Sequence, residues 1–289
     1  MKILAIALFF LLTACSSVPV ATTGIKTAAE PPAVPVAVAP PVTAAPPVTT
    51  IPNFLLIISD DQRYDTMKYM PLTVNRIFHE GVTFENAFIT TPLCCPSRAS
   101  IFTGLYASNH GVHTNEDSLS QRTFVDVLHE QGYYTGLVGK YLNSWDPGLR
   151  RPEFDRWVEF ARSKEDRSNE TESRNAKSSY YIDPRINVDG VWGKHPGYLT
   201  YILRDYAVDF LRKATQQQKP FMLVFAPFAP HGPADPAPED KRLYASLAPH
   251  RPPSFNEEDL SDKPAWLRVG RPAKVSPAAM DEFRLKQIR

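Results

Sequence analysis

The chain has 289 residues, of which 43% are hydrophobic, and its 32 basic and 31 acidic residues leave a formal net charge of +1. This length and apolar content are sufficient for one large globular domain with its own core. The near-neutral balance excludes the basic surface typical of nucleic-acid-binding proteins, so we expect no nucleic-acid partner. Only three cysteines are present, which excludes a disulfide framework.

Residues 1–15 have the features of an export signal. A lysine follows Met1, and the apolar run over 3–12 is too short to span a bilayer. The sequence LTAC over 12–15 is similar to a bacterial lipobox, in which the cysteine is acylated; the alternative is an ordinary signal peptide that contains a cysteine. Lipidation of Cys15 would hold the chain to a membrane, because each buried methylene contributes about 0.8 kcal/mol. We therefore expect an exported bacterial lipoprotein, and Ser16 favours the outer membrane, on its periplasmic or cell-surface side.

Residues 16–52 form a second predicted region, which from Val18 onward is almost wholly Pro, Ala, Val and Thr. Repeated prolines block both helices and central strands, so this region is predicted to be an extended, semi-rigid tether. Its expected role is to hold the following domain away from the membrane.

Residues 53–289 alternate predicted strands and helices. The run over 53–59 is continuously apolar, which is typical of a strand buried on both faces of a parallel sheet. Residues 240–289 are rich in proline and charge and predict surface loops, with a helical stretch from Asp281. The other predicted strands lie over 133–138 and 221–226. The predicted helices lie over 71–79, 96–103, 123–129 and 199–211. This alternation predicts a doubly wound, largely parallel α/β sheet flanked by helices.

The most informative stretch is residues 94–104, CCPSRASIFTG. Pro96 suits the first position of a helix and Gly104 its C-terminal cap. Cys94 would then lie where backbone N–H groups and the helix dipole favour negative charge. Arg98, four residues later on the same face, offers a bidentate fork for an oxyanion. This arrangement suits attack on a sulfate or phosphate ester, whereas the alternative is a cysteine that serves as a small buried hydrophobe.

The pattern C-x-P-S-R over 94–98, followed by Thr103 and Gly104, resembles the signature of the type I sulfatases. In that family the first cysteine is converted to formylglycine, and the spacing selects Cys94 rather than Cys95. The extended sequence PLCCPSR most resembles the N-acetylglucosamine-6-sulfatase-like branch. The resemblance covers residues 53–289 and implies an alkaline-phosphatase-like fold, of which this chain is the first part.

Polar residues follow three of the predicted strands, where ligands bind in doubly wound sheets. On their own, adjacent aspartates often cap turns, a lysine is usually solvated, and a histidine is more often structural than catalytic. The sequence SDDQ over 59–62 resembles the family's first metal-binding motif, which implies that Asp60, Asp61 and Cys94 bind Ca²⁺ or another divalent cation. Residues 132–140, GYYTGLVGK, resemble the second sulfatase signature, which ends at Lys140. His231 matches a family histidine that faces the sulfate ester.

The resemblance implies a sulfuric ester hydrolase that removes sulfate from a sulfated sugar or glycan. A hydroxyl of the hydrated formylglycine at position 94, acidified by the cation, would attack sulfur. Arg98 and Lys140 would hold the sulfate oxygens, and His231 would protonate the departing alcohol. Lys140 and His231 are therefore also the expected substrate-binding residues. A formylglycine-generating maturation enzyme is an implied partner.

Three features leave alternatives open. Many sulfatases carry a histidine two residues after the lysine, where this chain has Leu142, a difference that the glycan-sulfatase branch shares. Family members are longer and supply further metal ligands, commonly an Asp-Asn pair, which nothing after His231 provides here. A catalytically incomplete sulfatase-like protein is therefore one alternative, and a phosphodiesterase or phosphonate hydrolase of the same superfamily is another. We expect the remaining histidines to be structural or peripheral: His79, His110, His113, His129, His195 and His250.

Overall fold

The protein is described here by a computed structural model, which describes residues 51–146, 148–160, 180–270 and 274–289. The chain divides into two units, residues 1–49 and 50–289, and the described residues all belong to the second. The predicted signal with Cys15, and the tether up to residue 50, lie outside the described residues and stay predictions. Within the described ranges, we find no helix with the length and apolar character needed to cross a membrane.

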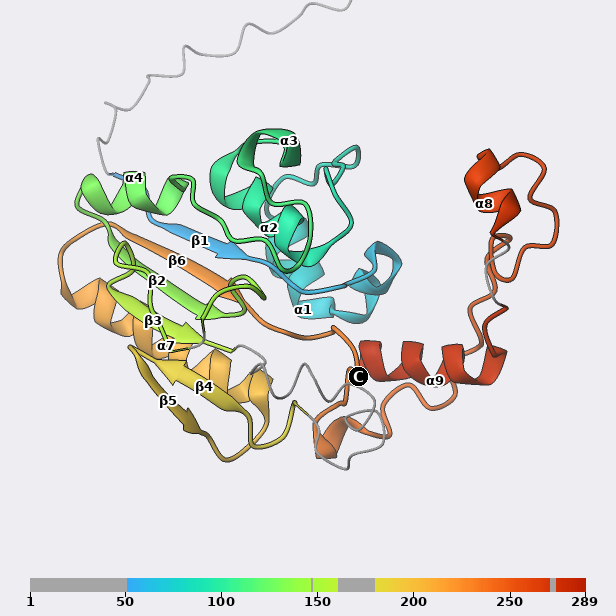
Figure 1. Ribbon diagram of the computed structural model, residues 1–289. Helices are drawn as coiled ribbons and strands as arrows, with labels where there is room; N and C mark the ends of the chain where they lie inside the picture. Colours follow the sequence, from blue (N-terminus) through green and yellow to red (C-terminus); the bar gives the residue numbers. More distant parts are fainter. Residues whose placement is uncertain (1–50, 147, 161–179, 271–273) are drawn as a thin grey trace, which may run out of the picture. The chain divides into compact units, whose positions relative to one another are not determined.

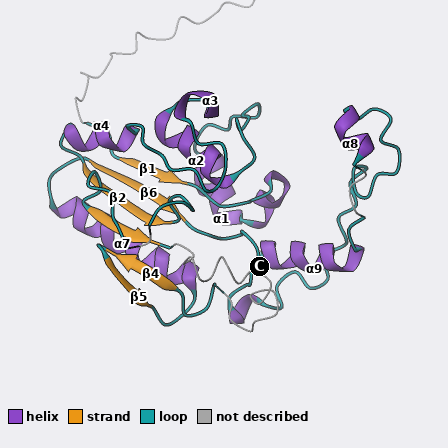
Figure 2. Ribbon diagram, in the orientation of Figure 1, coloured by secondary structure: helices purple, strands orange, loops and turns teal. Residues whose placement is uncertain are grey.

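The described part of the second unit is built on a mixed sheet (Figure 2). In spatial order its strands are β1 (Phe54–Ile57), β6 (Phe221–Ala226), β2 (Tyr134–Gly139), β3 (Arg156–Glu159), β4 (Arg185–Val188) and β5 (Val191–Lys194). The first four strands in this order, β1, β6, β2 and β3, are parallel to one another. Strand β4 is antiparallel to β3, and β5 is antiparallel to β4. The predicted α/β sheet flanked by helices is confirmed, and the antiparallel edge is an addition that the sequence pattern did not indicate.

Helices cover both faces of the sheet (Figure 1). Leu137 and Val224 contribute to a core that includes residues of α2 (Cys94–Thr103) and α4 (Phe124–Glu130). Their neighbours in the strands, Val138 and Leu223, contribute to the opposite core beneath α7 (Leu199–Gln216). Successive residues of a strand point to opposite faces, so strands buried on both sides are apolar throughout, as the sequence predicted.

The remaining helical segments are short, apart from the last. They are η1 (Tyr64–Tyr69), α1 (Pro71–Thr73), the π-helix η2 (Val74–Phe78), α3 (Ala107–His110), η3 (Pro238–Asp240), α8 (Ala265–Val269) and α9 (Pro277–Ile288). The helix predicted over 71–79 is therefore α1 continued by η2. The loops predicted for residues 240–289 are interrupted by α8 and by α9, which begins before Asp281 because the Ser276 side chain caps it.

Two capping features define the helices near the site. Helix α2 begins at Cys94, two residues before the predicted start, so Pro96 lies in the first turn, where no helical hydrogen bond needs its N–H. Gly104 ends the helix with a φ of 71°, in the left-handed conformation predicted for it. Helix α4 begins with a capping box between Thr123 and Asp126.

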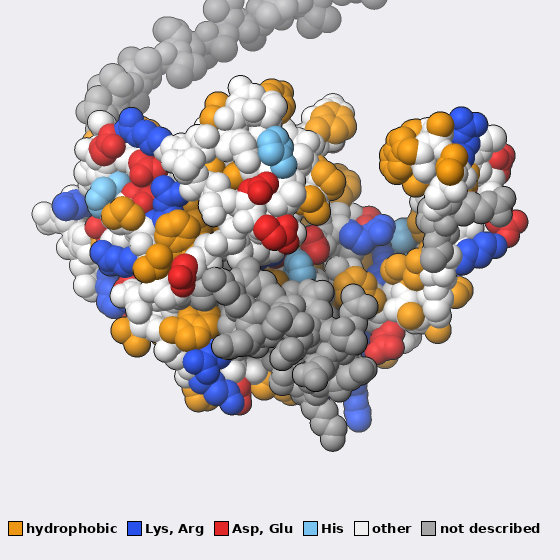
Figure 3. Space-filling view, viewed as in Figure 1, with side chains coloured by type: hydrophobic (Ala, Val, Ile, Leu, Met, Phe, Trp, Pro, Cys, Tyr) orange, Lys and Arg blue, Asp and Glu red, His pale blue; other side chains and the backbone are white. Residues whose placement is uncertain are grey.

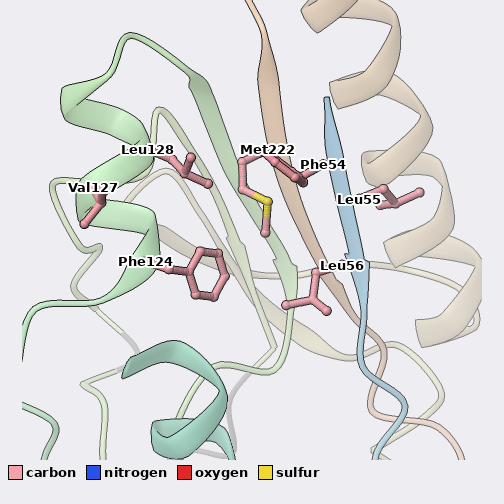
Figure 4. Close-up of a pocket in the computed structure, with 7 residues that line it drawn as sticks. All are labelled: Phe54, Leu55, Leu56, Phe124, Val127, Leu128 and Met222. Carbon is pink, nitrogen blue, oxygen red and sulfur yellow. The ribbon is translucent and has the colours of Figure 1, made fainter. Parts of the chain in front are cut away.

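Strand β1 differs from its prediction, because it is not buried on both faces. Leu55 is 48% exposed, and Phe54 and Ile57 are exposed to similar extents, since within the described residues β1 pairs only with β6. Beside β1 lies an apolar pocket of about 520 Å³ (Figure 4). It is lined by Phe54, Leu55, Leu56, Phe124, Val127, Leu128 and Met222. An exposed apolar edge strand is a site for unwanted strand pairing.

We expect Leu55→Lys to reduce self-association of the chain, because a charge on an edge strand opposes pairing with another edge. Since Leu55 is half-exposed, the substitution should cost less than about 1 kcal/mol of stability. Light scattering against concentration measures the effect. Val191→Lys, at an exposed apolar position on the opposite edge strand β5, is the matched control. Equal effects of the two substitutions would show that β1 has no special part in association.

Candidate active site

The polar residues singled out from the sequence lie together at the carboxyl ends of three neighbouring parallel strands. Asp60 and Asp61 follow β1, Lys140 follows β2, and His231 follows β6. Helix α2 contributes the nearby Cys94 and Arg98. The backbone itself joins these segments, because the Asp60 N–H donates to the Ala229 carbonyl at 3.3 Å.

A buried charge network connects Asp60, Arg98 and Lys140. Lys140 Nζ lies 2.6 Å from one carboxylate oxygen of Asp60, and an Arg98 guanidinium nitrogen lies 3.7 Å from the other. A second Arg98 nitrogen donates to the Lys140 carbonyl at 2.6 Å. The three residues are 5%, 3% and 6% exposed, respectively. Two cations against one carboxylate leave an excess of positive charge in a region shielded from water, which favours binding of an oxyanion.

Gly139 positions Lys140 and was not identified by sequence reasoning as a functional residue. Its φ of 123° is in a region that favours glycine, and a Cβ at this position would lie 2.0 Å from the Ala226 carbonyl oxygen. The close approach allows the Lys140 N–H to donate to the same oxygen at 2.8 Å. The sequence signal was the glycine directly before the lysine, at the end of a predicted strand.

We expect Gly139→Ala to lower the free energy of unfolding by about 3 kcal/mol, from backbone strain and the clash with Ala226 together. Gly190→Ala is a matched control, because Gly190 has a φ of 96° but nothing within 4 Å of the added Cβ. The control should lose only the strain contribution, about 1 kcal/mol. Urea unfolding curves of both variants measure the difference. If both lose the same stability, the Ala226 contact does not constrain position 139.

Cys94 and His231 form an interacting pair. A hydrogen bond with His231, together with the charge of Lys140, holds the pKa of the Cys94 thiol below its ordinary value, against the effects of burial and the nearby aspartates. Burial alone would lower the pKa of His231, but hydrogen bonds to Cys94 and to the Gly232 carbonyl outweigh it and raise that pKa. The pair therefore favours a negative group at position 94 beside a positive imidazole.

Three neighbours fix the orientation of His231. Its Nδ1 lies 2.8 Å from the Gly232 carbonyl oxygen, and because a carbonyl only accepts, Nδ1 carries the hydrogen. The Tyr181 hydroxyl donates to the His231 carbonyl at 2.7 Å. The Phe228 ring stacks on the imidazole with centroids 4.5 Å apart and lies 5.5 Å from Lys140 Nζ. Nε2 is therefore the ring nitrogen available to a reacting group. Sequence reasoning missed Tyr181 and Phe228, which have no motif of their own.

The comparisons with known proteins agree with this arrangement. A family model described as Sulfatase matches residues 52–256. The chain belongs to the sulfatase family. The extracellular sulfatase SULF-1 homolog of Drosophila melanogaster is 33% identical over 239 residues, which are 76% of this chain and 20% of that protein. The N-acetylglucosamine-6-sulfatase of Homo sapiens is 32% identical over 228 residues, which are 71% of this chain and 39% of that protein.

A solved structure extends the comparison to three dimensions. The structure of BT4656 in complex with its substrate D-glucosamine-2-N,6-O-disulfate matches with a TM-score of 0.59 and 27% identity, and the match covers 72% of this chain and 40% of that one. The predicted sulfatase family and fold are thus confirmed. This sulfatase-family chain spans well under half the length of these three relatives.

The carboxylates of the site suit a hard divalent cation, although the described residues supply only part of a coordination shell. Among them, one group of His, Cys and acidic side chains has ligand atoms within 4.8 Å of one another: Asp60, Cys94 and His231. Asp61 extends from a left-handed turn with a φ of 59°, and its carboxylate lies 3.6 Å from His231 Nε2. Calcium takes six to eight oxygen ligands, so Asp60 and Asp61 could supply only some of them, and further oxygen ligands would be required.

A small cavity of about 210 Å³ opens beside α2 of this sulfatase-family chain. Its lining includes Asp60, Asp61, Cys94 and Arg98, together with apolar residues of the segments around them. Cys95 points elsewhere: it is fully buried, and its sulfur accepts from the Asn143 N–H at 3.1 Å. The two adjacent thiols thus have different surroundings, and the selection of Cys94 as the modified residue stays a prediction.

In the unmodified chain, we expect iodoacetamide to alkylate Cys94 well before Cys95. Burial raises the pKa of Cys95, whereas that of Cys94 is lowered, so the Cys94 thiolate forms at lower pH. Cys95 is also fully buried while Cys94 is partly exposed, so at pH 8 we expect Cys94 to react about ten times faster or more. Peptide mass spectrometry measures both rates. In His231→Gln the pH profile of Cys94 should move upward, and an unchanged profile would contradict the pairing.

His110 has a structural role in this sulfatase-family chain. Its Nδ1 accepts from the Val112 N–H at 3.1 Å, so Nε2 carries the hydrogen and donates to Ser100 Oγ at 3.0 Å. This buried imidazole connects α2 to α3, and burial lowers its pKa. His250 lies beside Arg63 and Asp65. These two residues come shortly after the Asp60-Asp61 motif in the sequence, whereas His250 is 187 residues away from Arg63.

Proposed function

We propose that this chain carries the nucleophile, the sulfate-binding cations and the first metal ligands of a sulfatase that hydrolyses sulfate esters of sugars. The observation that carries the proposal is the convergence of Cys94, Arg98, Lys140 and His231 from three separate segments of the chain. The proposal is supported by the resemblance of the stretches that carry these residues to sulfatase motifs. The names of the relatives support sulfated sugars as the substrate class, since they include an N-acetylglucosamine-6-sulfatase.

Arg98 and Lys140 bind the sulfate group in the proposed reaction. Both side chains are buried. Within the described residues, the ion pairs of Arg98 and Lys140 are both with Asp60, so one negative charge offsets two positive charges. Their positive charge stabilises the negative charge that grows on the sulfate oxygens as the ester bond breaks. The Arg98 guanidinium donates a hydrogen bond to the Lys140 carbonyl and so holds the two residues at a fixed distance from each other. Little reorganisation is therefore needed when the substrate binds.

His231 supplies the proton for the leaving alcohol. Its Nδ1 hydrogen is committed to the Gly232 carbonyl, which leaves Nε2 toward Cys94 and the reacting centre. In the unmodified chain the hydrogen bonds to Cys94 and Gly232 raise the pKa of His231, and the Gly232 hydrogen bond, which does not depend on the thiol, favours the protonated imidazole that a general acid requires. Formylglycine at position 94, when formed, supplies a nucleophile that can be regenerated after each turnover.

Asp60 and Asp61 are the residues that would hold a divalent cation, for which we propose Ca²⁺. The adjacent carboxylates, one buried and one exposed, are suitable oxygen donors. The cation would supply Lewis acidity at the nucleophile and the sulfate group.

The setting that we propose for this reaction is outside the bacterial cytoplasm. The lipobox-like Cys15 and the proline-rich tether support an outer-membrane lipoprotein, and the motif at Cys94 supports processing by a formylglycine-generating maturation enzyme. The alternative, a catalytically incomplete sulfatase-like protein, is favoured by the partial set of metal ligands among the described residues.

Co-expression of the full chain with a maturation enzyme tests the proposal. We expect the peptide that contains Cys94 to show the mass loss of a thiol exchanged for an aldehyde, and the Ca²⁺-loaded protein to release sulfate from glucosamine 6-O-sulfate. Modification without sulfate release would support the catalytically incomplete alternative. An unmodified thiol together with absent activity would overturn the proposed chemistry.

A further inference from the structure

We propose that Arg63, His250, Arg251 and Arg284 form a second anion-binding subsite, which recognises an additional acidic group on the sugar substrate. These four residues are called the Arg63 cluster below. The inference rests on the proposed function and narrows its substrate class to sugars or glycans that carry a second sulfate or a carboxylate. Residues from three distant parts of the chain build the cluster, and none of them belongs to a sulfatase signature identified in the sequence.

Asp65 lies at the centre of the Arg63 cluster. Arg63 Nε donates to one of its carboxylate oxygens at 2.8 Å, while His250 Nε2 and an Arg284 nitrogen lie 3.6 Å from the other. Arg63 also lies 3.4 Å from His250. Arg251 forms two 2.6 Å hydrogen bonds with Asp281, which is one turn before Arg284 in α9. Two carboxylates therefore face three guanidinium groups, which leaves an excess of one positive charge, and His250 Nε2 accepts from Arg63.

Hydrogen bonding around Asp65 is incomplete. The oxygen that faces His250 and Arg284 is buried without a hydrogen-bond partner, and Arg284 Nε is likewise buried and without one. The 3.6 Å separations are too long for hydrogen bonds, although they permit ionic attraction. Buried polar atoms are normally satisfied. The Asp65 oxygen lacks a donor, whereas Arg284 Nε lacks an acceptor, so this unpaired Arg284 donor is the atom that indicates a place for an anionic oxygen of a ligand.

The Arg63 cluster is adjacent to the catalytic residues. Arg63 is two residues after Asp61. On the other side, Gln287 of α9 donates to the Pro230 carbonyl at 3.3 Å, next to His231. Gln287 is three residues after Arg284 and therefore lies about one helical turn along the same face of α9. A Cβ at Gly232 would lie 3.6 Å from the Phe283 ring, so α9 packs against the segment that carries His231.

The cluster is accessible as well as close. The Arg63 side chain is 50% exposed, and His250 and Arg251 are about one-third exposed. Figure 3 shows Lys and Arg side chains beside a histidine at the edge of a hollow in the surface. Arginine forks match both sulfate and carboxylate oxygens, so the shared requirement is an oxyanion rather than one particular acid. A monosulfated sugar would leave the cluster unused.

The test compares three ligands on the full, Ca²⁺-loaded chain with Cys94 left unmodified, which binds without turnover, by isothermal titration calorimetry. They are glucosamine 6-O-sulfate, glucosamine 2-N,6-O-disulfate, and a 6-O-sulfated glucosamine joined to a uronic acid. We expect the second acidic group to increase affinity about tenfold, the scale of one charge-assisted hydrogen bond. The ligand whose affinity increases more, relative to glucosamine 6-O-sulfate, shows whether the cluster recognises a second sulfate or a carboxylate.

Arg63→Gln and His250→Gln should each remove most of this gain while changing affinity for the monosulfated sugar less than about twofold. Arg204→Gln is the matched control, because Arg204 is an exposed arginine on α7 that pairs with Asp205. Equal affinity of the wild type for all three ligands, or equal losses for all three in the variants, would overturn the subsite alone. Failure to bind any of them would also contradict the proposed function.

Discussion

Cys94→Ala is expected to reduce sulfate release by at least about 10⁴-fold, the scale seen when an enzyme loses its nucleophile. Alanine cannot be converted to formylglycine, and no other described side chain in the 210 Å³ cavity has a thiol to convert, because Cys95 is not among the residues that line it. The protein should remain folded, since Cys94 is only partly buried at the start of α2. Sulfate release from glucosamine 6-O-sulfate and thermal unfolding measure the two effects separately.

Cys95→Ala is the matched control for this prediction. Its sulfur lies against the Asn143 N–H and the Asn115 carbonyl, in a fully buried position. The substitution should therefore cost about 1–2 kcal/mol of stability while sulfate release falls less than about tenfold. If activity survives Cys94→Ala, or is lost equally in both variants, Cys94 is not the source of the nucleophile.

Lys140→Met is expected to lower the free energy of unfolding by about 3–5 kcal/mol, because it removes one partner of a buried ion pair. Asp60 would keep only the more distant Arg98, at 3.7 Å. Sulfate release should also fall about 10²–10³-fold, since a donor to the sulfate oxygens is lost. Urea unfolding and sulfate-release assays report the two losses.

A double variant separates the two roles of Lys140. In Lys140→Met with Asp60→Asn, the buried carboxylate loses its charge, so we expect most of the stability to return. Activity should stay low in any case because Asp60 is also a proposed metal ligand, so unfolding is the measurement that isolates the structural role of Lys140. Lys194→Met is the control for losing a lysine, because Lys194 is largely exposed and forms a surface pair with Asp183. It should change stability by less than about 0.5 kcal/mol. A double variant that stays as unstable as Lys140→Met would show that the unpaired charge of Asp60 is not the source of the loss.

Sequence reasoning predicted the elements whose signals are local. The apolar runs at 53–59 and 221–226, the amphipathic pattern of α7 and the glycine cap of α2 all depend on residues close together in the chain. The location of the site could also be predicted from these local patterns, because the carboxyl ends of neighbouring parallel strands lie at one edge of the sheet. The sequence motifs then indicated which polar side chains at that edge belong to the site.

What the sequence did not reveal depends on contacts between distant segments. The exposure of β1 follows from its place at the edge of the described sheet, and strand order is not encoded in the apolar run itself. Gly139 is required by its approach to Ala226, a residue in another strand. The Arg63 cluster likewise depends on the packing of α9, so His250 had no local signal that distinguished it from other histidines.

The position of β6 in the sheet has a consequence for the order in which the site forms. Asn53 and Phe221 are 168 residues apart, yet they are hydrogen-bonded where β1 and β6 begin. Because β6 lies between β1 and β2, neither pairing exists until residue 226 has been synthesised. Such long-range pairing slows folding. Asp60 and Lys140 therefore meet only at a late stage, and until then a newly made chain exposes the Cys94 segment outside a finished site.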